Sequence, residues 1–412
     1  MATSTRPPLP SVLPPLICGT ATFNVQYNAD PFKMPSNEIV QKALEAGVCA
    51  FDTSPYYGPS EEILEYRLIT SSPRTGKALI QPTILAHHPR SSYYLLTKVG
   101  RIASSSFDYS PAWINHSIQR SLARLHTTYL DVVYLHDVEF VTPSEVLTAI
   151  QALRALQAQG IVHYVGISGY PVPVLCDLAE MILRETGTPC DVVMSYANFT
   201  IQNQVLGMEG LGRLAKAGVK CVPNASVLGM GLLRSRGVPS PKEDWHPAPG
   251  ELREKVQEAA RWVESKGERL EVVSIRWGLE RWALEGVLDK SEKGMGISVM
   301  GVSNIRELEE TLRVWNSVLD GMDIPGREVS KEKKEWSLKR REEVEQLAAE
   351  VREILGEKWR EFAWASPDEG WVNERVVKGV TDEDLAAFPS TAVDPVESKG
   401  KEKVEVKEMG RL

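Results

Sequence analysis

Short apolar runs recur along the chain, and each is followed by a longer stretch whose apolar residues return every three or four positions. The short runs lack the two-residue alternation of a half-exposed strand, so they predict strands buried on both faces, and the longer stretches predict helices. The expected strands are 15–20, 48–52, 93–98, 130–136, 162–167, 191–195, 219–222 and 297–300. The main expected helices are 35–46, one beginning near 60, and then 111–125, 143–159, 171–185, 209–217, 251–266, 270–285 and 305–319.

Strict alternation of eight strand-then-helix units predicts a parallel sheet covered by helices, closed as a (β/α)8 TIM barrel of the α/β class. The rival is an open doubly wound sheet, but no GxGxxG follows the first strand. We expect a flexible leader over 1–12, the barrel over 13–325, a helical and loop extension over 326–390, and a disordered tail over 391–412. Residues 70–92 are expected to form a surface insertion.

Composition and charge remove several classes of partner. A net charge of -8 disfavours nucleic acid, and no apolar run is long enough to span a membrane. The N-terminus is too rich in proline for a signal peptide, and the five cysteines contain no CxxC pair. These features predict a cytoplasmic protein with reduced thiols. His87 and His88 fall in the expected insertion, where a solvated loop is favoured over a metal site.

Candidate catalytic residues stand at the ends of three successive expected strands: Asp52, Lys98 and His136. Tyr57 lies on the loop that follows Asp52. In a β/α barrel, side chains at the carboxyl ends of the strands surround one mouth. An ammonium can stabilise a phenolate and lower its pKa, a carboxylate can hold that ammonium, and an imidazole can orient a carbonyl or hydroxyl. Each residue alone has an ordinary structural explanation, but together they predict proton transfer to or from an oxygen.

The segments DTSPYYG, LLTKVG and DVVYLHD, in this order, resemble the aldo-keto reductases. The resemblance covers about residues 12–320. It implies a catalytic tetrad of Asp52, Tyr57, Lys98 and His136, a (β/α)8 barrel, and NAD(P)(H) bound across the mouth without a metal.

The segment ISVMGVSNIRELEETL (297–312) resembles the family's adenosine-phosphate region. The resemblance implies cofactor contacts from a set spread over several strand ends: Gly19, Thr20, Ser168, Ser226, Leu228, Gly301, Ser303, Asn304, Glu307 and Glu310. Members that prefer NADP carry a basic residue where this chain has Glu307. An acidic side chain there repels a 2′-phosphate and accepts a hydrogen bond from a free 2′-OH, so NAD is expected over NADP. Arg306 keeps NADP as the alternative.

The chain also departs from the commonest reductases, and the departures indicate a branch. Gly169 replaces an asparagine that holds the carboxamide, an apolar residue near Val193 replaces a glutamine, and Ala225 replaces a stacking tyrosine. GISGYPVPVL, VVMSYANF and NASVLGMGLL resemble the branch of L-galactose dehydrogenase and fungal NAD-dependent D-arabinose dehydrogenase.

That branch implies an NAD-dependent aldose 1-dehydrogenase acting on D-arabinose, L-galactose or L-fucose. The expected substrate pocket includes Phe23, Trp113 and His136, with Trp364 and Trp371 as further candidates. The alternatives are a general NADPH-dependent aldehyde or pyridoxal reductase, and a non-catalytic barrel scaffold. The sequence predicts neither the particular sugar nor the oligomeric state.

Overall fold

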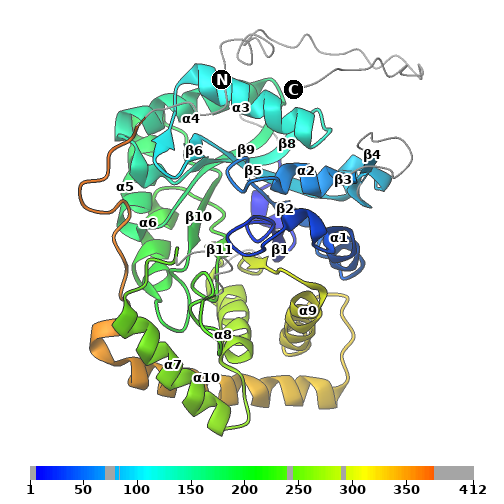
Figure 1. Ribbon diagram of the computed structural model, residues 1–412, viewed down its shortest axis with the longest axis vertical. Coiled ribbons are helices and arrows are strands. Elements are labelled where there is room, and N and C mark those ends of the chain that lie inside the picture. Colours follow the sequence, from blue (N-terminus) through cyan, green and yellow to red (C-terminus); the bar gives the residue numbers. More distant parts are fainter. Residues whose placement is uncertain (1–5, 70–78, 83, 239–244, 289–293, 375–412) are drawn as a thin grey trace.

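The computed structural model describes residues 6–69, 79–82, 84–238, 245–288 and 294–374. Eight parallel strands close into a barrel in the order β1, β2, β5, β8, β9, β10, β11 and β12, so the predicted fold class is confirmed (Figure 1). The strands are β1 (Leu16–Gly19), β2 (Ala50–Asp52), β5 (Tyr94–Val99), β8 (Leu130–His136), β9 (Val162–Gly169), β10 (Val192–Tyr196), β11 (Asn224–Ala225) and β12 (Ser298–Gly301).

The expected seventh strand at 219–222 is wrong in position. The named strand β11 begins at Asn224, and Cys221 contributes only an isolated bridge to Val192. Pro223 lies between the two, and it has no N–H to donate to the ladder. The pairing is therefore interrupted where the apolar pattern predicts it to be continuous.

Helices cover the outside of the barrel. They are α1 (Ser36–Glu45), α2 (Ser60–Glu65), α3 (Pro111–Arg124), α4 (Pro143–Ala158), α5 (Val172–Thr186), α6 (Leu211–Lys216), α7 (Gly250–Ser265), α8 (Leu270–Glu285), α9 (Ile305–Asp320) and α10 (Lys331–Trp359). Several starts have a local cause: Ser110 caps α3, and Thr142 forms a capping box with Glu145 at α4. The expected helix at 209–217 is divided into a π-helical turn, Leu206–Gly210, followed by α6.

The amino-terminal end of the barrel is closed by residues of the expected leader. Leu9–Ser11 forms a short 3-10 helix, and Leu9 and Leu13 are buried in the cluster that fills the barrel interior. The hydroxyl of Tyr164 donates to the carbonyl of Pro7 at 2.8 Å. Residues 6–13 therefore form the floor of the barrel, opposite the mouth.

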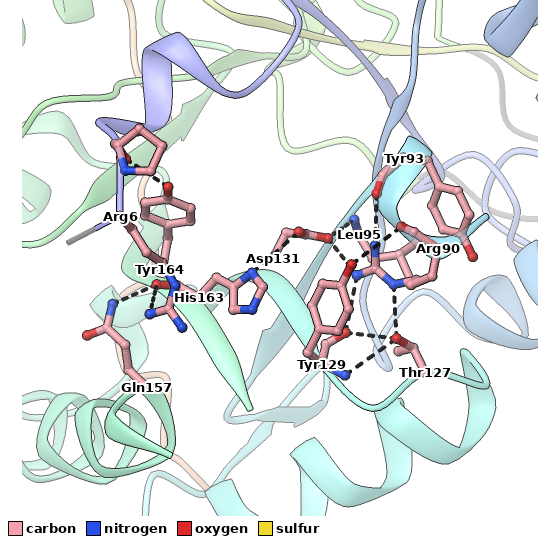
Figure 2. Close-up of polar contacts among 11 residues, drawn as sticks. Arg6, Arg90, Tyr93, Leu95, Thr127, Tyr129, Asp131, Gln157, His163 and Tyr164 are labelled. Atoms are coloured by element: carbon pink, nitrogen blue, oxygen red, sulfur yellow. Dashed lines mark hydrogen bonds and ion pairs between the residues drawn. The ribbon is translucent and has the colours of Figure 1, made fainter. Parts of the chain in front are cut away.

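A polar network surrounds this floor (Figure 2). Asp131, near the start of β8, accepts from Arg90 at 2.6 Å and from the backbone N–H of Leu95 at 2.8 Å. The Arg90 guanidinium lies 4.0 Å from the ring centroid of Tyr129, and the His163 ring stacks on that ring at 4.6 Å. These contacts join strand β8 to the elements beside it at the end remote from the mouth.

The region after the barrel consists of one long helix and a segment without regular secondary structure. Helix α10 packs on α7, α8 and α9, and its Val344, Ala348, Val351 and Leu355 are buried. Residues 360–374, the strap, then run back along one side of the molecule toward the mouth (Figure 1). The Trp364 ring stacks on Tyr170 at 4.6 Å. The strap ends against Phe107, whose N–H donates to Asn373 Oδ1 and whose carbonyl accepts from Asn373 Nδ2, each at 3.0 Å.

Two antiparallel strand pairs lie outside the barrel sheet, one between α2 and β5 and the other directly after β5. They are β3 (Tyr66–Ile69) with β4 (Leu79–Pro82), and β6 (Arg101–Ala103) with β7 (Ser106–Phe107). Strand β4 falls within the expected insertion, 70–92. The short helices Ile84–His87 and Arg90–Ser92 lie in the same range. Residues 375–390 of the expected extension and the whole expected tail, 391–412, lie outside the described residues. Across the part of the chain that is described, no helix is long and apolar enough to cross a bilayer.

Candidate active site

The first two strand-end residues form a buried ion pair at the mouth. Asp52 ends β2, Lys98 lies in the neighbouring strand β5, and Lys98 Nζ is 2.6 Å from Asp52 Oδ1. The Lys98 side chain is 1% exposed and the Asp52 side chain 5%. Lys98 Nζ also donates to the carbonyl of Thr53 at 3.0 Å and lies 4.8 Å from the ring centroid of Tyr57. The structure thus brings Asp52, Tyr57 and Lys98 together.

The electrostatics of Tyr57 differ from the expected lowering of its pKa. Burial raises the pKa of Tyr57 to about 12, although the positive charge of Lys98 acts in the opposite direction. Burial also opposes the charge of Lys98, yet Asp52 and Tyr57 raise the pKa of this ammonium above its ordinary value. Lys98 is therefore a fixed cation, and Tyr57 is a neutral phenol before any ligand binds.

His136 joins this group from the end of β8. Its Nδ1 lies 3.2 Å from Ser54 Oγ, and its ring lies 5.7 Å from the Tyr57 ring in an edge-on arrangement. Burial lowers the pKa of His136 to about 3, so its imidazole is neutral at pH 7. The hydroxyl of Tyr109 donates to the His136 carbonyl at 2.7 Å, which fixes the end of the strand. A neutral imidazole can orient a substrate oxygen by hydrogen bonding without adding a charge.

Three ionisable residues at the mouth are missing from the sequence-based site: Arg101, Asp137 and Glu139. Arg101 and Asp137 form an ion pair beneath the Tyr56 ring, whose centroid lies 3.9 Å from the guanidinium carbon. Asp137 Oδ2 lies 3.6 Å from Nε2 of His136. A usable signal was present, because Arg101 and Asp137 follow tetrad residues closely in KVGR and LHD.

Glu139 lies behind this pair, under the end of β9. Its Oε1 accepts from the N–H of Tyr170 and from the hydroxyl of Ser366, each at 3.0 Å. Its Oε2 is buried, with no hydrogen-bond partner among the described residues. Burial, together with the negative charge of Asp137, raises the pKa of Glu139 to about 8. A Cβ at Gly169 would lie 2.4 Å from Oε2, so Glu139 occupies the space that a larger residue would need.

The expected adenosine-phosphate region sits at the end of β12 and the start of α9. Gly301 is exposed, and a Cβ there would meet only Thr22 within 4 Å. Asn304 caps α9 by accepting from the N–H of Glu307 at 3.0 Å. An open glycine leading into the amino terminus of a long helix suits the phosphate side of a dinucleotide.

Glu307 is already engaged in this structure. It accepts from the N–H of Ser303 at 2.8 Å and pairs with Arg234 at 2.9 Å. Glu310 pairs with Arg269, which also lies 3.5 Å from Glu271. No sequence pattern predicts a role for Arg234 or Arg269, which come from the loop after β11 and from the start of α8.

The other expected cofactor residues lie at strand ends around the mouth. Gly19 ends β1 in register with Asp52, and the next residue, Thr20, donates its hydroxyl to the Asp52 carbonyl at 3.0 Å. Ser168 pairs in register with His136 and donates to the Leu135 carbonyl at 3.2 Å. Ser226 and Leu228 follow β11, where the carbonyl of Ser226 accepts from Gly229 and that of Leu228 from Gly231 and Leu233.

The structure places two expected substrate residues away from these contacts. Phe23 is fully buried in the main hydrophobic core, and Trp113 is buried on α3, where its ring contacts His116 and Arg120 of the same helix. Their role toward a substrate stays a prediction. Within the described residues, no group of three or more His, Cys, Asp or Glu side chains could hold a metal ion.

Comparison with known proteins gives a family and several relatives. A family model described as Aldo/keto reductase family matches residues 15–326. D-arabinose 1-dehydrogenase of Saccharomyces cerevisiae is 38% identical over 300 residues, covering 72% of this chain and 82% of that protein. L-galactose dehydrogenase of Arabidopsis thaliana is 31% identical over 276 residues, covering 66% of this chain and 75% of that protein.

The fold also matches a solved structure. A glycerol dehydrogenase from Gluconobacter oxydans superposes with a TM-score of 0.53 at 21% identity, covering 82% of this chain and 92% of that one. At this identity the likeness concerns the barrel alone.

Proposed function

Because this chain belongs to the aldo/keto reductase family, we propose that it is an NAD-dependent aldose 1-dehydrogenase. It would oxidise the anomeric carbon of a free sugar of the D-arabinose, L-galactose or L-fucose type to the aldonolactone. The family makes it an oxidoreductase that binds a nicotinamide cofactor and a small carbonyl or sugar substrate. The sugar assignment comes from the relatives, two of which are named as dehydrogenases of aldoses.

The observation that carries the chemistry is the buried Lys98–Asp52 pair beneath the Tyr57 ring. We assign Tyr57 as the group that takes the proton from the C1 hydroxyl, with Lys98 stabilising the phenolate and Asp52 holding Lys98 in place. His136, neutral at pH 7, would orient the hydroxyl. A bound nicotinamide supplies the hydride acceptor. Since burial keeps Tyr57 protonated, the residue needs a further positive charge nearby before it acts as a base.

Glu307 supports NAD as the cofactor. A carboxylate near the adenosine ribose accepts a hydrogen bond from a free 2′-OH and repels a 2′-phosphate. The residues that would hold the cofactor are those at the ends of β1, β9, β11 and β12, with Asn304, Glu307 and Glu310 at the adenosine side.

One observation favours the second candidate, an NADPH-dependent aldehyde reductase. Arg234 pairs with Glu307 and offsets its charge, which weakens the argument against a 2′-phosphate.

We also place the protein in the cytoplasm, because all five cysteines are free thiols.

A substrate panel with both cofactors tests the proposal. We expect NADH formation with at least one of D-arabinose, L-galactose and L-fucose, and slower turnover with NADP. Tyr57→Phe should abolish turnover while leaving cofactor binding, measured by quenching of tryptophan fluorescence, unchanged. No turnover of any aldose, beside efficient NADPH-dependent reduction of simple aldehydes, would favour the second candidate.

A further inference from the structure

We propose that Asp137 and Arg101 recognise the hydroxyl next to the reacting carbon, so that the enzyme selects substrates with a hydroxyl at C2. This inference deepens the proposed function and rests on it for the identity of the sugar. It assigns a substrate-binding role to two residues outside the catalytic tetrad.

The position of Asp137 is the first support. Its Oδ2 lies 3.6 Å from Nε2 of His136, the ring nitrogen that does not face Ser54. Its negative charge is also close enough to Tyr57 to raise the pKa of that phenol. A substrate oxygen held between Tyr57 and His136 would therefore have the Asp137 carboxylate beside it.

The backbone of Asp137 is the second support. Its φ of 55° and ψ of 63° place it in the left-handed region, which few residues other than glycine, asparagine and aspartate adopt. This conformation turns the carboxylate of the residue after His136 toward the mouth. Left-handed residues recur at functional sites, and here the conformation accompanies a buried carboxylate 3.6 Å from Nε2 of His136.

Arg101 is held in place from several sides. Its guanidinium lies 3.9 Å from the Tyr56 ring centroid, 5.4 Å from that of Phe107 and 5.6 Å from that of Phe140. The aromatic box fixes the guanidinium, which pairs with Asp137 through one terminal nitrogen. Its Nε is buried without a hydrogen-bond partner among the described residues. A buried, unsatisfied donor is costly unless a ligand or water completes it.

The chemistry of an aldose matches this pair. In a cyclic sugar, C1 is flanked by the C2 hydroxyl on one side and by the ring oxygen on the other. A carboxylate can only accept, so Asp137 suits the C2 hydroxyl, whereas the Arg101 guanidinium can donate to either oxygen. Burial keeps the Glu139 carboxyl neutral at pH 7. Of the two carboxyl groups, Asp137 is therefore the one that can accept as a carboxylate. A simple aldehyde without this hydroxyl offers Asp137 no donor and leaves the buried Nε of Arg101 without a partner.

The test compares substrates that differ only at C2. Asp137→Asn is the variant of choice because asparagine also tolerates the left-handed conformation, so folding is retained. For the wild type we expect a higher kcat/KM for an aldose than for its 2-deoxy counterpart, and for lactaldehyde (2-hydroxypropanal) than for propanal. Losing a charged hydrogen bond should reduce each ratio by roughly 10- to 100-fold.

Asp131→Asn is the matched control. Asp131, like Asp137, is a buried aspartate paired with an arginine, but it lies near the start of β8, at the floor end of the barrel (Figure 2). It should change thermal stability and leave both substrate ratios at the wild-type value. Unchanged ratios in Asp137→Asn, or equal loss in both variants, would overturn the proposal. If the wild type oxidises no aldose, the proposed function fails, but the lactaldehyde-to-propanal ratio, measured in the direction of reduction, still decides the role of Asp137.

Discussion

Replacing Glu139 by glutamine should make the protein more stable than the wild type at high pH. Glutamine keeps the carbonyl that accepts from Tyr170 and Ser366, and it removes only the ability to ionise. The pKa of Glu139 is raised from the ordinary value of 4.5 to about 8, by burial first and by Asp137 second. The folded wild type therefore holds a proton that the unfolded chain releases above pH 4.5.

The sign and size of the effect follow from linkage. A group whose pKa is higher in the folded state contributes stability below its unfolded pKa, and this stability is lost as the pH rises toward the folded pKa. Each pKa unit corresponds to about 1.4 kcal/mol, so between pH 5 and pH 9 the wild type should lose about 4 kcal/mol through Glu139 alone. Glu139→Gln should lack this loss.

Urea unfolding at pH 5 and pH 9 measures the difference directly. The free energy of unfolding of Glu139→Gln minus that of the wild type should increase between the two pH values by about 4 kcal/mol. Glu350→Gln, at an exposed position of α10, is the control and should give no such increase. A difference for Glu139→Gln that stays constant with pH would show that this carboxyl is not held neutral by its surroundings.

Three further predictions concern the tetrad, the cofactor and the backbone. Asp52→Asn should lower the free energy of unfolding, measured in urea, by about 3–5 kcal/mol, because it leaves Lys98 buried without its counter-ion. Adding Lys98→Met should restore stability but not turnover. Arg234→Ala frees Glu307 and should raise the KM for NADP relative to that for NAD by roughly 2- to 5-fold, and improved use of NADP would contradict this. Gly100→Ala should lower the free energy of unfolding by about 3 kcal/mol, since φ is +100° and the new Cβ would lie 2.2 Å from the Tyr109 ring. An unchanged Tm would refute this clash.

The barrel could be predicted from the sequence because its strands are short, apolar runs separated by well-capped helices. The pattern failed locally where a single residue changes the hydrogen bonding. Pro223 displaces β11, and the π-helical turn at Leu206–Gly210 precedes α6 although the apolar spacing gives no sign of it. Neither change alters the periodicity on which the prediction rests.

Only the site residues that lie at or just after the ends of barrel strands could be predicted from the sequence. Asp52, Lys98 and His136 follow directly from the rule that strand ends meet at the mouth, and the structure brings them together with Tyr57. Partners that come from distant segments could not be found in this way. Ser366 reaches Glu139 across 227 positions, and such a pairing leaves no local pattern in the sequence.

The strap has a consequence for how the protein matures during synthesis. Asn373 bonds to Phe107 across 266 positions, and Trp364 stacks on Tyr170, so residues made late complete a wall whose other parts are made early. Chains fold from the amino terminus as they emerge from the ribosome. The tetrad can therefore assemble on a nascent chain well before the strap arrives, and the barrel exposes Tyr170 and Phe107 during that interval.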